Sequence, residues 1–109
     1  MTQRPIGPRQ KVTLKITQAQ ADLILENDYI DQEVLDSLDF SEPHAGIVGL
    51  RCTLDALEEV QGYIAAESNH AKNKTLRRSL GELFDAIDSF KSEFIKEEPA
   101  LGRLYMLKK

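Results

Sequence analysis

Few residues of this sequence have the chemistry of a nucleophile, a general base or a metal ligand. The chain has one cysteine, Cys52, and two histidines, His44 and His70. A cysteine–histidine catalytic pair needs both side chains within hydrogen-bond reach and a third group that orients the histidine. Cys52 lies in an alternating apolar segment, which favours a small buried core residue over a nucleophile. The sequence therefore predicts no catalytic residues, no cofactor and no enzymatic activity.

A second pattern, at residues 67–70, has the Glu-x-x-His spacing of di-iron carboxylate sites. This spacing places Glu67 and His70 on one face of a helix, but such sites need a second copy of the motif and two further glutamates. A structural zinc site needs four ligands, which one cysteine and two scattered histidines do not supply. A metal-dependent enzyme is therefore the third of three functional hypotheses, and no metal ligand is predicted.

The most distinctive charged segment covers residues 72–78 and precedes the last predicted helix. Cations at a helix N-terminus oppose the helix dipole, whereas free backbone amides near Thr75 attract an anion. The candidate contacts for an anion or a nucleic acid are therefore Lys72, Lys74, Arg77 and Arg78. We favour the simpler interpretation of a solvated basic turn, because sequence-specific DNA-binding domains are usually more basic overall.

Charge occurs in blocks along the chain of 109 residues, whose net charge is −4. Residues 1–15 carry four cations and no acid, and residues 16–50 carry eight acids and no Lys or Arg. Such blocks steer encounters without identifying the partner. No apolar run approaches the ~20 residues of a membrane span, and the N-terminus lacks the apolar block of a signal peptide. With one cysteine there is no internal disulfide, so we expect a cytoplasmic protein without membrane association.

The first half of the chain predicts a short strand followed by two short helices. Residues 1–10 contain two prolines and a glycine, so we expect a flexible basic tail. Residues 11–16 alternate polar and apolar side chains, as a half-buried strand does. Thr17 and Gln20 then form a capping box, which predicts a helix that ends near Asn27.

The strand and helix pattern recurs further along the chain. A second short helix is expected at residues 31–38, and residues 39–46 have the proline, glycine and serine content of a loop. Residues 48–52 alternate again, and Thr53 can cap a helix that follows. The apolar side of that helix comprises Leu54, Leu57, Val60 and Ile64.

The last helix has the strongest apolar pattern in the chain. Its large side chains recur at alternating spacings of four and three, which is typical of a helix that packs along one stripe. The stripe is widened by Phe84 and comprises Leu76, Leu80, Leu83, Ile87, Phe90 and Phe94. Pro99 ends this helix by about Glu98, and we expect the apolar and basic segment 99–109 to dock on the domain or on a neighbour.

These elements predict one mainly α domain with minor β structure, an α+β fold, over residues 11–98. The expected order is strand–helix–helix–strand–helix–helix, with about four helices and two short strands. We expect the first strand to pair with the second, and the apolar C-terminus could add a third.

Three helix starts, at residues 16–20, 53–57 and 73–77, carry short motifs: ITQAQ, TLDAL and NKTLR. In this order they resemble small uncharacterised bacterial helical domains, some of them attached to plasmid ORF-3-like proteins. Those domains have an I-T-x-x-Q start, a T-x-x-E-L start and a basic turn before a final helix. The resemblance covers roughly residues 12–90 and departs at Ala56, where the family has an acid. It implies an architecture and no site, because the family has no established activity.

The leading functional hypothesis is a small, non-enzymatic protein–protein interaction module with an unidentified protein partner. We also expect a homodimer, formed through the final helix or the C-terminal segment. The alternative is a nucleic-acid-binding or regulatory protein that uses the basic turn at residues 72–78.

Overall fold

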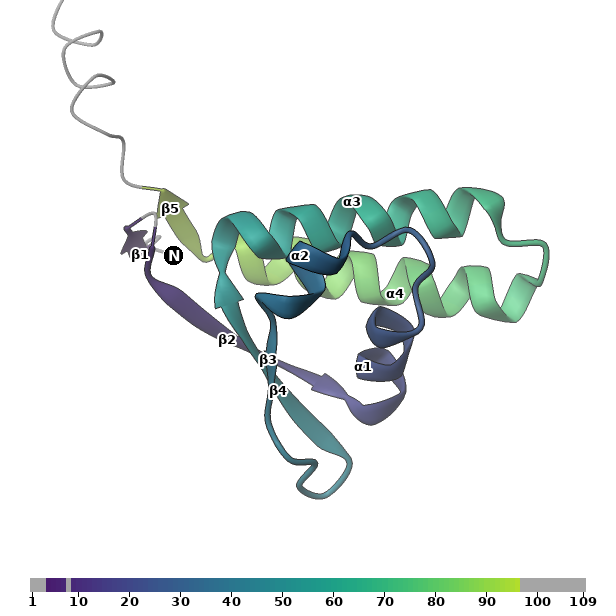
Figure 1. Ribbon diagram of the computed structural model, residues 1–109, viewed down its shortest axis with the longest axis horizontal. Coiled ribbons are helices and arrows are strands. Elements are labelled where there is room, and N and C mark those ends of the chain that lie inside the picture. Colours follow the sequence, from purple (N-terminus) through teal and green to yellow (C-terminus); the bar gives the residue numbers. More distant parts are fainter. Residues whose placement is uncertain (1–3, 8, 97–109) are drawn as a thin grey trace, which may run out of the picture.

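Two long helices and a small antiparallel sheet make up most of the structure, a computed structural model that describes residues 4–7 and 9–96 (Figure 1). The mainly helical α+β class predicted from the sequence is confirmed. The elements are β1 (Arg4–Ile6), β2 (Lys11–Thr17), α1 (Gln18–Leu25), α2 (Gln32–Asp36), β3 (Asp39–Phe40), β4 (Ile47–Thr53), α3 (Leu54–His70), α4 (Lys74–Lys91) and β5 (Phe94–Lys96).

The central sheet has the strand order β2–β4–β3, and both pairings are antiparallel. β2 and β4 pair along seven residues, from Lys11 opposite Thr53 to Thr17 opposite Ile47. This confirms the pairing expected between the two strands with alternating side chains. β3 adds only two residues, which lie opposite the middle of β4.

Threonines cap the helices that follow β2 and β4, as the sequence predicts. The Thr17 hydroxyl accepts a hydrogen bond from the Gln20 amide at 3.1 Å, and the Gln20 side chain accepts one from the Thr17 amide at 2.9 Å. At the second junction the Thr53 hydroxyl accepts from the Ala56 amide at 3.1 Å. Each cap satisfies backbone donors that a helix start leaves free, and so fixes where the strand ends.

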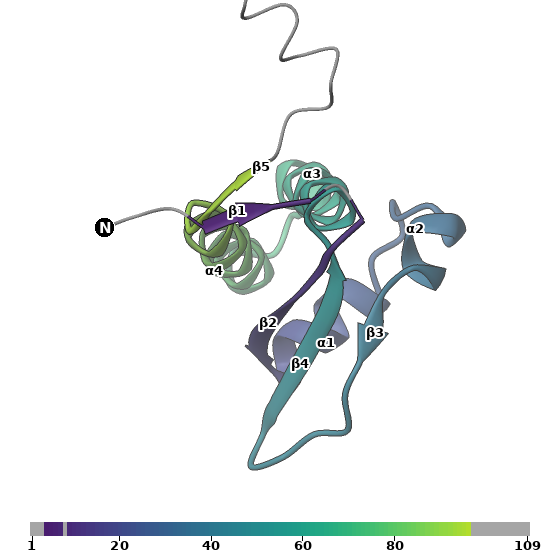
Figure 2. The same cartoon turned by 90° about the vertical axis from the view of Figure 1, so that its left-hand side faces the viewer.

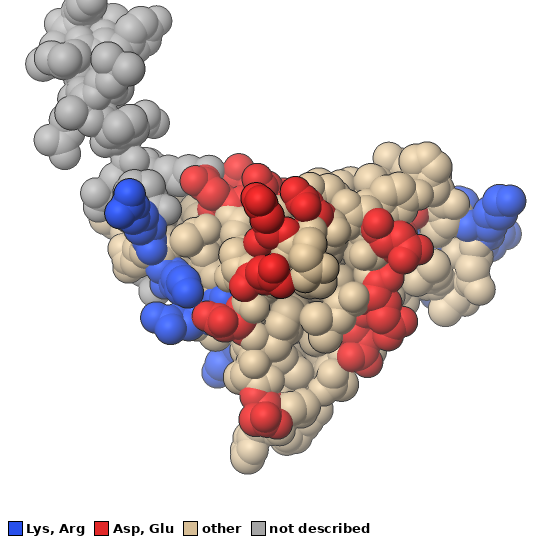
Figure 3. Space-filling view, viewed as in Figure 1, with Lys and Arg blue, Asp and Glu red and all other residues tan. Residues whose placement is uncertain are grey.

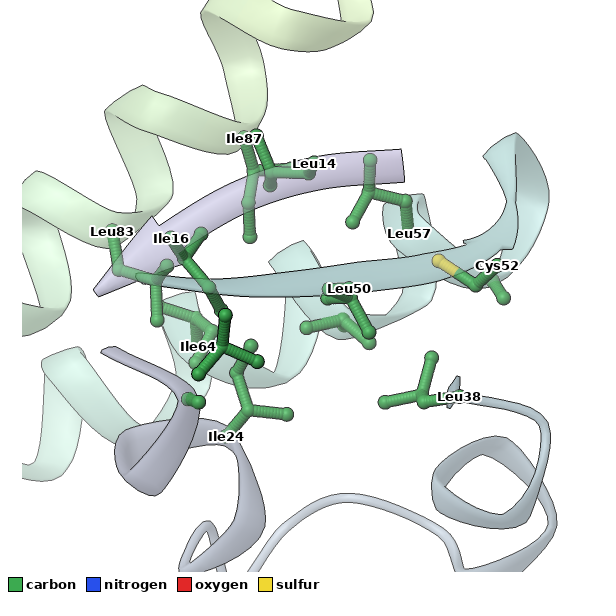
Figure 4. Packing of buried hydrophobic residues seen from close by; sticks show 14 of the residues in the cluster. Leu14, Ile16, Ile24, Leu38, Leu50, Cys52, Leu57, Ile64, Leu83 and Ile87 are labelled. Carbon is green, nitrogen blue, oxygen red and sulfur yellow. The ribbon is translucent and has the colours of Figure 1, made fainter. Parts of the chain in front are cut away.

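The core lies between the sheet and the α3–α4 hairpin. Leu14 and Ile16 of β2 and Leu50 of β4 point toward the helices, where Leu57, Ile64, Leu83 and Ile87 meet them (Figure 4). The predicted apolar side of α3 and the middle of the α4 stripe are fully buried, which confirms both assignments. Burial of such side chains stabilises a fold by roughly 1.5–3 kcal/mol each, so this hairpin dominates the core.

One buried polar side chain, Gln61 of α3, lies at the α3–α4 interface. Its amide nitrogen donates to the Phe84 carbonyl at 3.4 Å and to Asp88 Oδ1 at 3.1 Å. Its amide oxygen accepts from Lys91 Nζ at 2.5 Å. Because both polar atoms are bonded, the desolvation that burial of an amide requires is offset by these contacts.

The two ends of the described chain differ from the prediction. We expected residues 1–10 to be a flexible tail, but Arg4–Ile6 form β1, which pairs in parallel with β5. The apolar Ile6 explains this difference, because it is only 1% exposed and belongs to the core cluster. In Figure 2, β1 and β5 lie across one end of the α3–α4 hairpin.

The last helix is shorter than predicted. It was expected to continue to Glu98, but α4 ends at Lys91, and Phe94 belongs to β5. The backbone of residues 94–96 pairs with β1 instead of continuing the helix, and the Phe94 ring packs edge-on against Phe90, with 5.2 Å between ring centroids. β5 pairs with β1 as a separate two-stranded sheet, whereas the third strand expected from the apolar C-terminus lies outside the described residues. The docking expected of residues 99–109 lies outside the described residues.

The predicted loop at residues 39–46 also contains regular structure. Asp39 and Phe40 form β3, which pairs with Arg51 and Leu50 of β4. The partly buried Phe40 packs against the core and so draws this segment onto the sheet. With β1 and β5, the described residues contain five strands where the sequence predicted two.

Candidate functional site

The basic segment predicted as an anion or nucleic-acid contact forms the turn between α3 and α4. Lys72 lies in the connection, and Lys74, Arg77 and Arg78 lie in the first turns of α4. All four residues are exposed. Figure 3 shows that cations gather at this tip and, at the opposite end of the molecule, along β2, with acidic side chains between them over α1 and α2.

The backbone amides at the start of α4 are already bonded, which corrects the expectation that they are free to attract an anion. The Asn73 side chain accepts hydrogen bonds from the amides of Thr75 and Leu76, at 2.8 and 3.1 Å. Arg77 donates to the carbonyl of Ala71 at 2.6 Å and so closes the turn. Of the four candidate cations, Arg77 therefore has a structural contact.

Cys52 and the two histidines do not form a catalytic group. The Cys52 side chain lies in the core and is 1% exposed. The pKa of its thiol is raised to about 11, mainly by burial and also by the Asp39 carboxylate, while Lys11 acts in the opposite direction. His44 lies in the loop before β4, and His70 lies at the far end of α3, where its ring nitrogen is bonded to its own helix backbone. The structure thus places Cys52 where the sequence predicted, as a core residue.

Glu67 and His70 also have other contacts. The Glu67 carboxylate accepts a hydrogen bond from the buried Asn27 amide at 2.8 Å, and Asn27 in turn binds the backbone of the α1–α2 connection. Burial raises the pKa of Glu67, as does repulsion from Asp28 and Glu26. In the part of the chain that the structure describes, no three His, Cys, Asp or Glu side chains are arranged to hold a metal ion. The contacts of Glu67 indicate a role in holding this connection.

The sequence did not predict a further feature, an open face on the central sheet. The helices cover the face that carries Leu14 and Leu50, and the opposite face is exposed to solvent at Thr13, Lys15 and Arg51. Figure 2 looks onto this side, with the strands in front and α1 behind them. We call it the open face.

A hollow of about 660 Å³ lies on the open face, where the loop between β3 and β4 folds back beside β4. Its walls come from three neighbouring segments, so the fold rather than any local motif creates it. The lining residues are Thr13 and Lys15 of β2, Ile47, Gly49 and Arg51 of β4, and Asp39, Phe40, Ser41, Glu42, His44 and Ala45.

Gly49 forms the floor of this hollow. A Cβ atom at this position would lie 3.2 Å from the Thr13 methyl carbon and 3.4 Å from Ser41 Oγ, closer than ordinary van der Waals contact. The Ser41 hydroxyl accepts a hydrogen bond from the Gly49 amide at 2.7 Å, and the Ser41 amide donates to the Gly49 carbonyl at 2.9 Å. The missing side chain therefore lets Ser41 approach β4, and Ser41 and Thr13 fill the position above the glycine.

Side chains of both charges line the hollow. Lys15 lies on β2 and Arg51 on the central strand β4, Asp39 of β3 lies directly opposite Arg51, and Glu42 follows in the loop after β3. Asp39 is paired with Lys11, which lies outside the hollow, at 3.3 Å. Within the described residues, the Lys15 ammonium and the Arg51 guanidinium make no hydrogen bond or ion pair. The two cations are thus available to an incoming anionic group.

Comparison with known proteins finds no match to this chain among family models, curated proteins or solved structures. The resemblance to small bacterial helical domains stays a prediction. Among the residues that the structure describes, no helix is both long and apolar enough to cross a membrane. The function is therefore argued from the chemistry of the open face.

Proposed function

We propose that the protein is a small, non-enzymatic protein-binding module that holds its partner against the open face. The hollow carries this proposal, because it joins the exposed apolar Ile47 to two cations that make no ion pair with another described residue, within one concave surface. Protein interfaces combine such an apolar centre with a polar rim. Ile47 is 42% exposed although it lies in a strand, and an apolar side chain in that position gains stability when a partner covers it.

The chemistry of the hollow supports binding rather than catalysis. Asp39, Glu42 and His44 are suited to general acid–base work, but the Ser41 hydroxyl of the lining is bonded to backbone groups, and no hydrogen bond joins it to His44 among the described residues. The one cysteine of the chain faces the other side of the sheet. A catalytic histidine exchanges a proton with a nucleophile or substrate atom about 3 Å away, and other groups hold that atom in place.

A capture experiment with matched variants tests this proposal. The purified full chain is immobilised, and proteins retained from an extract of its native cells are quantified. Ile47→Lys should abolish retention of the specific partner, because it places a charge in the apolar part of the open face. Leu25→Lys is the matched control, since Leu25 on α1 is 48% exposed and undergoes the same change away from the hollow. A partner that is kept by Ile47→Lys and lost by Leu25→Lys would reject the open face.

The alternative function, nucleic-acid binding by the basic turn, has the weaker support. Arg77 is bonded within the turn and the helix amides are capped, so only Lys72, Lys74 and Arg78 are available there. A titration with DNA and RNA at two salt concentrations tests it, because phosphate contacts weaken as salt rises. Salt-sensitive binding that the triple glutamine variant of these residues abolishes would establish this alternative.

The homodimer stays a proposal, with one restriction on its contact. The centre of the α4 stripe, Leu80, Leu83 and Ile87, is 0% exposed because it packs inside the chain. These side chains are therefore not available to a second copy. Light scattering at increasing protein concentration tests the dimer directly, and a constant monomer mass would exclude it.

A further inference from the structure

We infer that the hollow on the open face binds a short acidic segment of the partner protein, in which a carboxylate lies beside a large apolar side chain. This inference rests on the proposed function and adds the chemistry of the partner. Three features carry it: two cations without an ion pair among the described residues, carboxylates on the β3 side of the same hollow, and the exposed apolar side chain of Ile47 at its edge.

The first feature is the pair of cations, Lys15 and Arg51. In the β2–β4 pairing, Thr13 lies opposite Arg51 and Lys15 lies opposite Gly49, so the two cations are diagonal neighbours on one face. Diagonal neighbours in a sheet lie roughly 7–8 Å apart at their Cβ atoms, within reach of long side chains. One carboxylate can therefore accept hydrogen bonds from both, with the planar guanidinium binding it through two parallel bonds. Lys11 differs from them, because Asp39 already neutralises it.

The acidic residues on the β3 side of the hollow set the direction in which the partner segment lies. Asp39 lies directly opposite Arg51 and is paired with Lys11, and Glu42 follows it on the β3 side of the hollow, where it makes no ion pair with another described residue. An acidic group of the partner is therefore attracted towards Lys15 and Arg51 and repelled from the Glu42 side. A nucleic acid fits less well, because its repeated phosphates would also bring negative charge against Asp39 and Glu42.

The apolar part of the partner segment fits beside Ile47. The exposed side chain of Ile47 borders the hollow, and Thr13 and Ser41 pack over Gly49 at its floor. The hollow of about 660 Å³ lies within the ~300–1,000 Å³ of typical ligand pockets, which is room for a few side chains and not for a helix. A large apolar side chain packed on Ile47 would exclude water from the carboxylate contact, which strengthens that contact.

Peptide selection tests the inference. A random 12-residue peptide library is selected on the full chain, and the selected sequences are compared with those from the Lys15→Gln/Arg51→Gln double variant. The wild-type chain should enrich peptides in which Asp or Glu adjoins a large apolar residue, and the double variant should lose the acidic preference. Enrichment that is equal on both chains, or that favours basic peptides, overturns the inference.

The strongest selected peptide then gives a quantitative test. Replacing its acidic residue by the amide should weaken binding to the wild-type chain at least about tenfold, as expected for a charge-assisted hydrogen bond. The same replacement should change binding to the Arg51→Gln variant much less, because the contact is already lost. An equal loss of peptide affinity for both chains would show that the acidic residue does not bind Arg51, which overturns the inference. Lys74→Gln removes an exposed cation at the other end of the molecule and should bind the peptide as the wild type does.

Two further variants separate failure of this inference from failure of the proposed function. Gly49→Leu displaces Thr13 and Ser41 at the floor of the hollow and Ile47→Lys charges its edge, and circular dichroism verifies that both fold. If both variants lose the peptide but its acidic residue is unimportant, the open face binds proteins and the acidic chemistry is wrong. If both variants bind normally, the open face itself is rejected. If the chain binds a single-stranded RNA 12-mer more tightly than the peptide, and Arg51→Gln abolishes this binding, the ligand of the open face is a nucleic acid and not a protein segment.

Discussion

The two faces of the β2–β4 pair are built from alternate residues of the same strands and have opposite properties. On the covered face Leu14, Ile16 and Leu50 are at most 7% exposed, whereas on the open face Lys15 and Arg51 are exposed. Successive side chains of a strand point to opposite sides of the sheet. Residues that hold the fold together and residues that we propose to contact a partner therefore alternate along the same strands.

The largest expected effect comes from placing the same charge on each face. Val48 is 2% exposed and its neighbour Ile47 is 42% exposed. Val48→Lys buries an unpaired ammonium and should lower the free energy of unfolding by more than about 4 kcal/mol, enough to prevent folding of a marginally stable domain. Ile47→Lys should change it by less than about 0.5 kcal/mol. Urea denaturation measures both, and equal losses would show that the open face is part of the core.

An intermediate effect is expected at the edge of the open face. Ser41→Ala removes the hydroxyl that accepts a hydrogen bond from the Gly49 amide at 2.7 Å. The free energy of unfolding should fall by about 1 kcal/mol, the usual net contribution of one such bond. Ser41→Thr keeps the hydroxyl and should retain most of the stability. If both variants unfold at the wild-type urea concentration, this bond does not hold the loop against β4.

An effect that is absent near neutral pH is expected at Cys52 on the covered face. Burial raises the pKa of its thiol from 9.0 to about 11, so the folded chain keeps a proton that the unfolded chain loses. The free energy of unfolding should therefore fall as the pH rises from about 9 towards 11. Cys52→Ala lacks this group, and its stability should fall less over the same range. Parallel curves for the two chains, from urea denaturation at each pH, would contradict burial of the thiol.

The parts of the fold that the sequence predicted depend on local signals. The Thr17 and Thr53 caps, the strand alternation of β2 and β4, and the buried side of α3 each lie within one element. Such periodicity follows from the geometry of a single helix or strand. The paired ends were missed, because β1 contains Pro5 and its partner β5 lies about ninety residues further along the chain. No hydrophobic periodicity in the sequence links two strands that lie so far apart.

The candidate site was missed for a related reason. Its far wall is formed by residues 39–45, whose composition indicates only a loop, and the chain must fold before this loop reaches β4. One signal was present: Gly49 interrupts a strand pattern. A glycine inside a strand often marks the close approach of another backbone or a ligand, and here Ser41 makes that approach. The basic turn, in contrast, was found by its charge alone, while its internal bonds depend on the folded geometry.

Gln61 has a consequence for how α3 and α4 are aligned along their length. The apolar stripe of α4 repeats at spacings of three and four residues, so a slide by one helical turn of ~5.4 Å would bring a new set of apolar side chains onto α3. That slide would separate Gln61 from all three of its partners on α4 and leave its amide unsatisfied, at a cost of about 1–3 kcal/mol. The Gln61 amide therefore selects one alignment of α3 and α4 among several that apolar packing alone would allow.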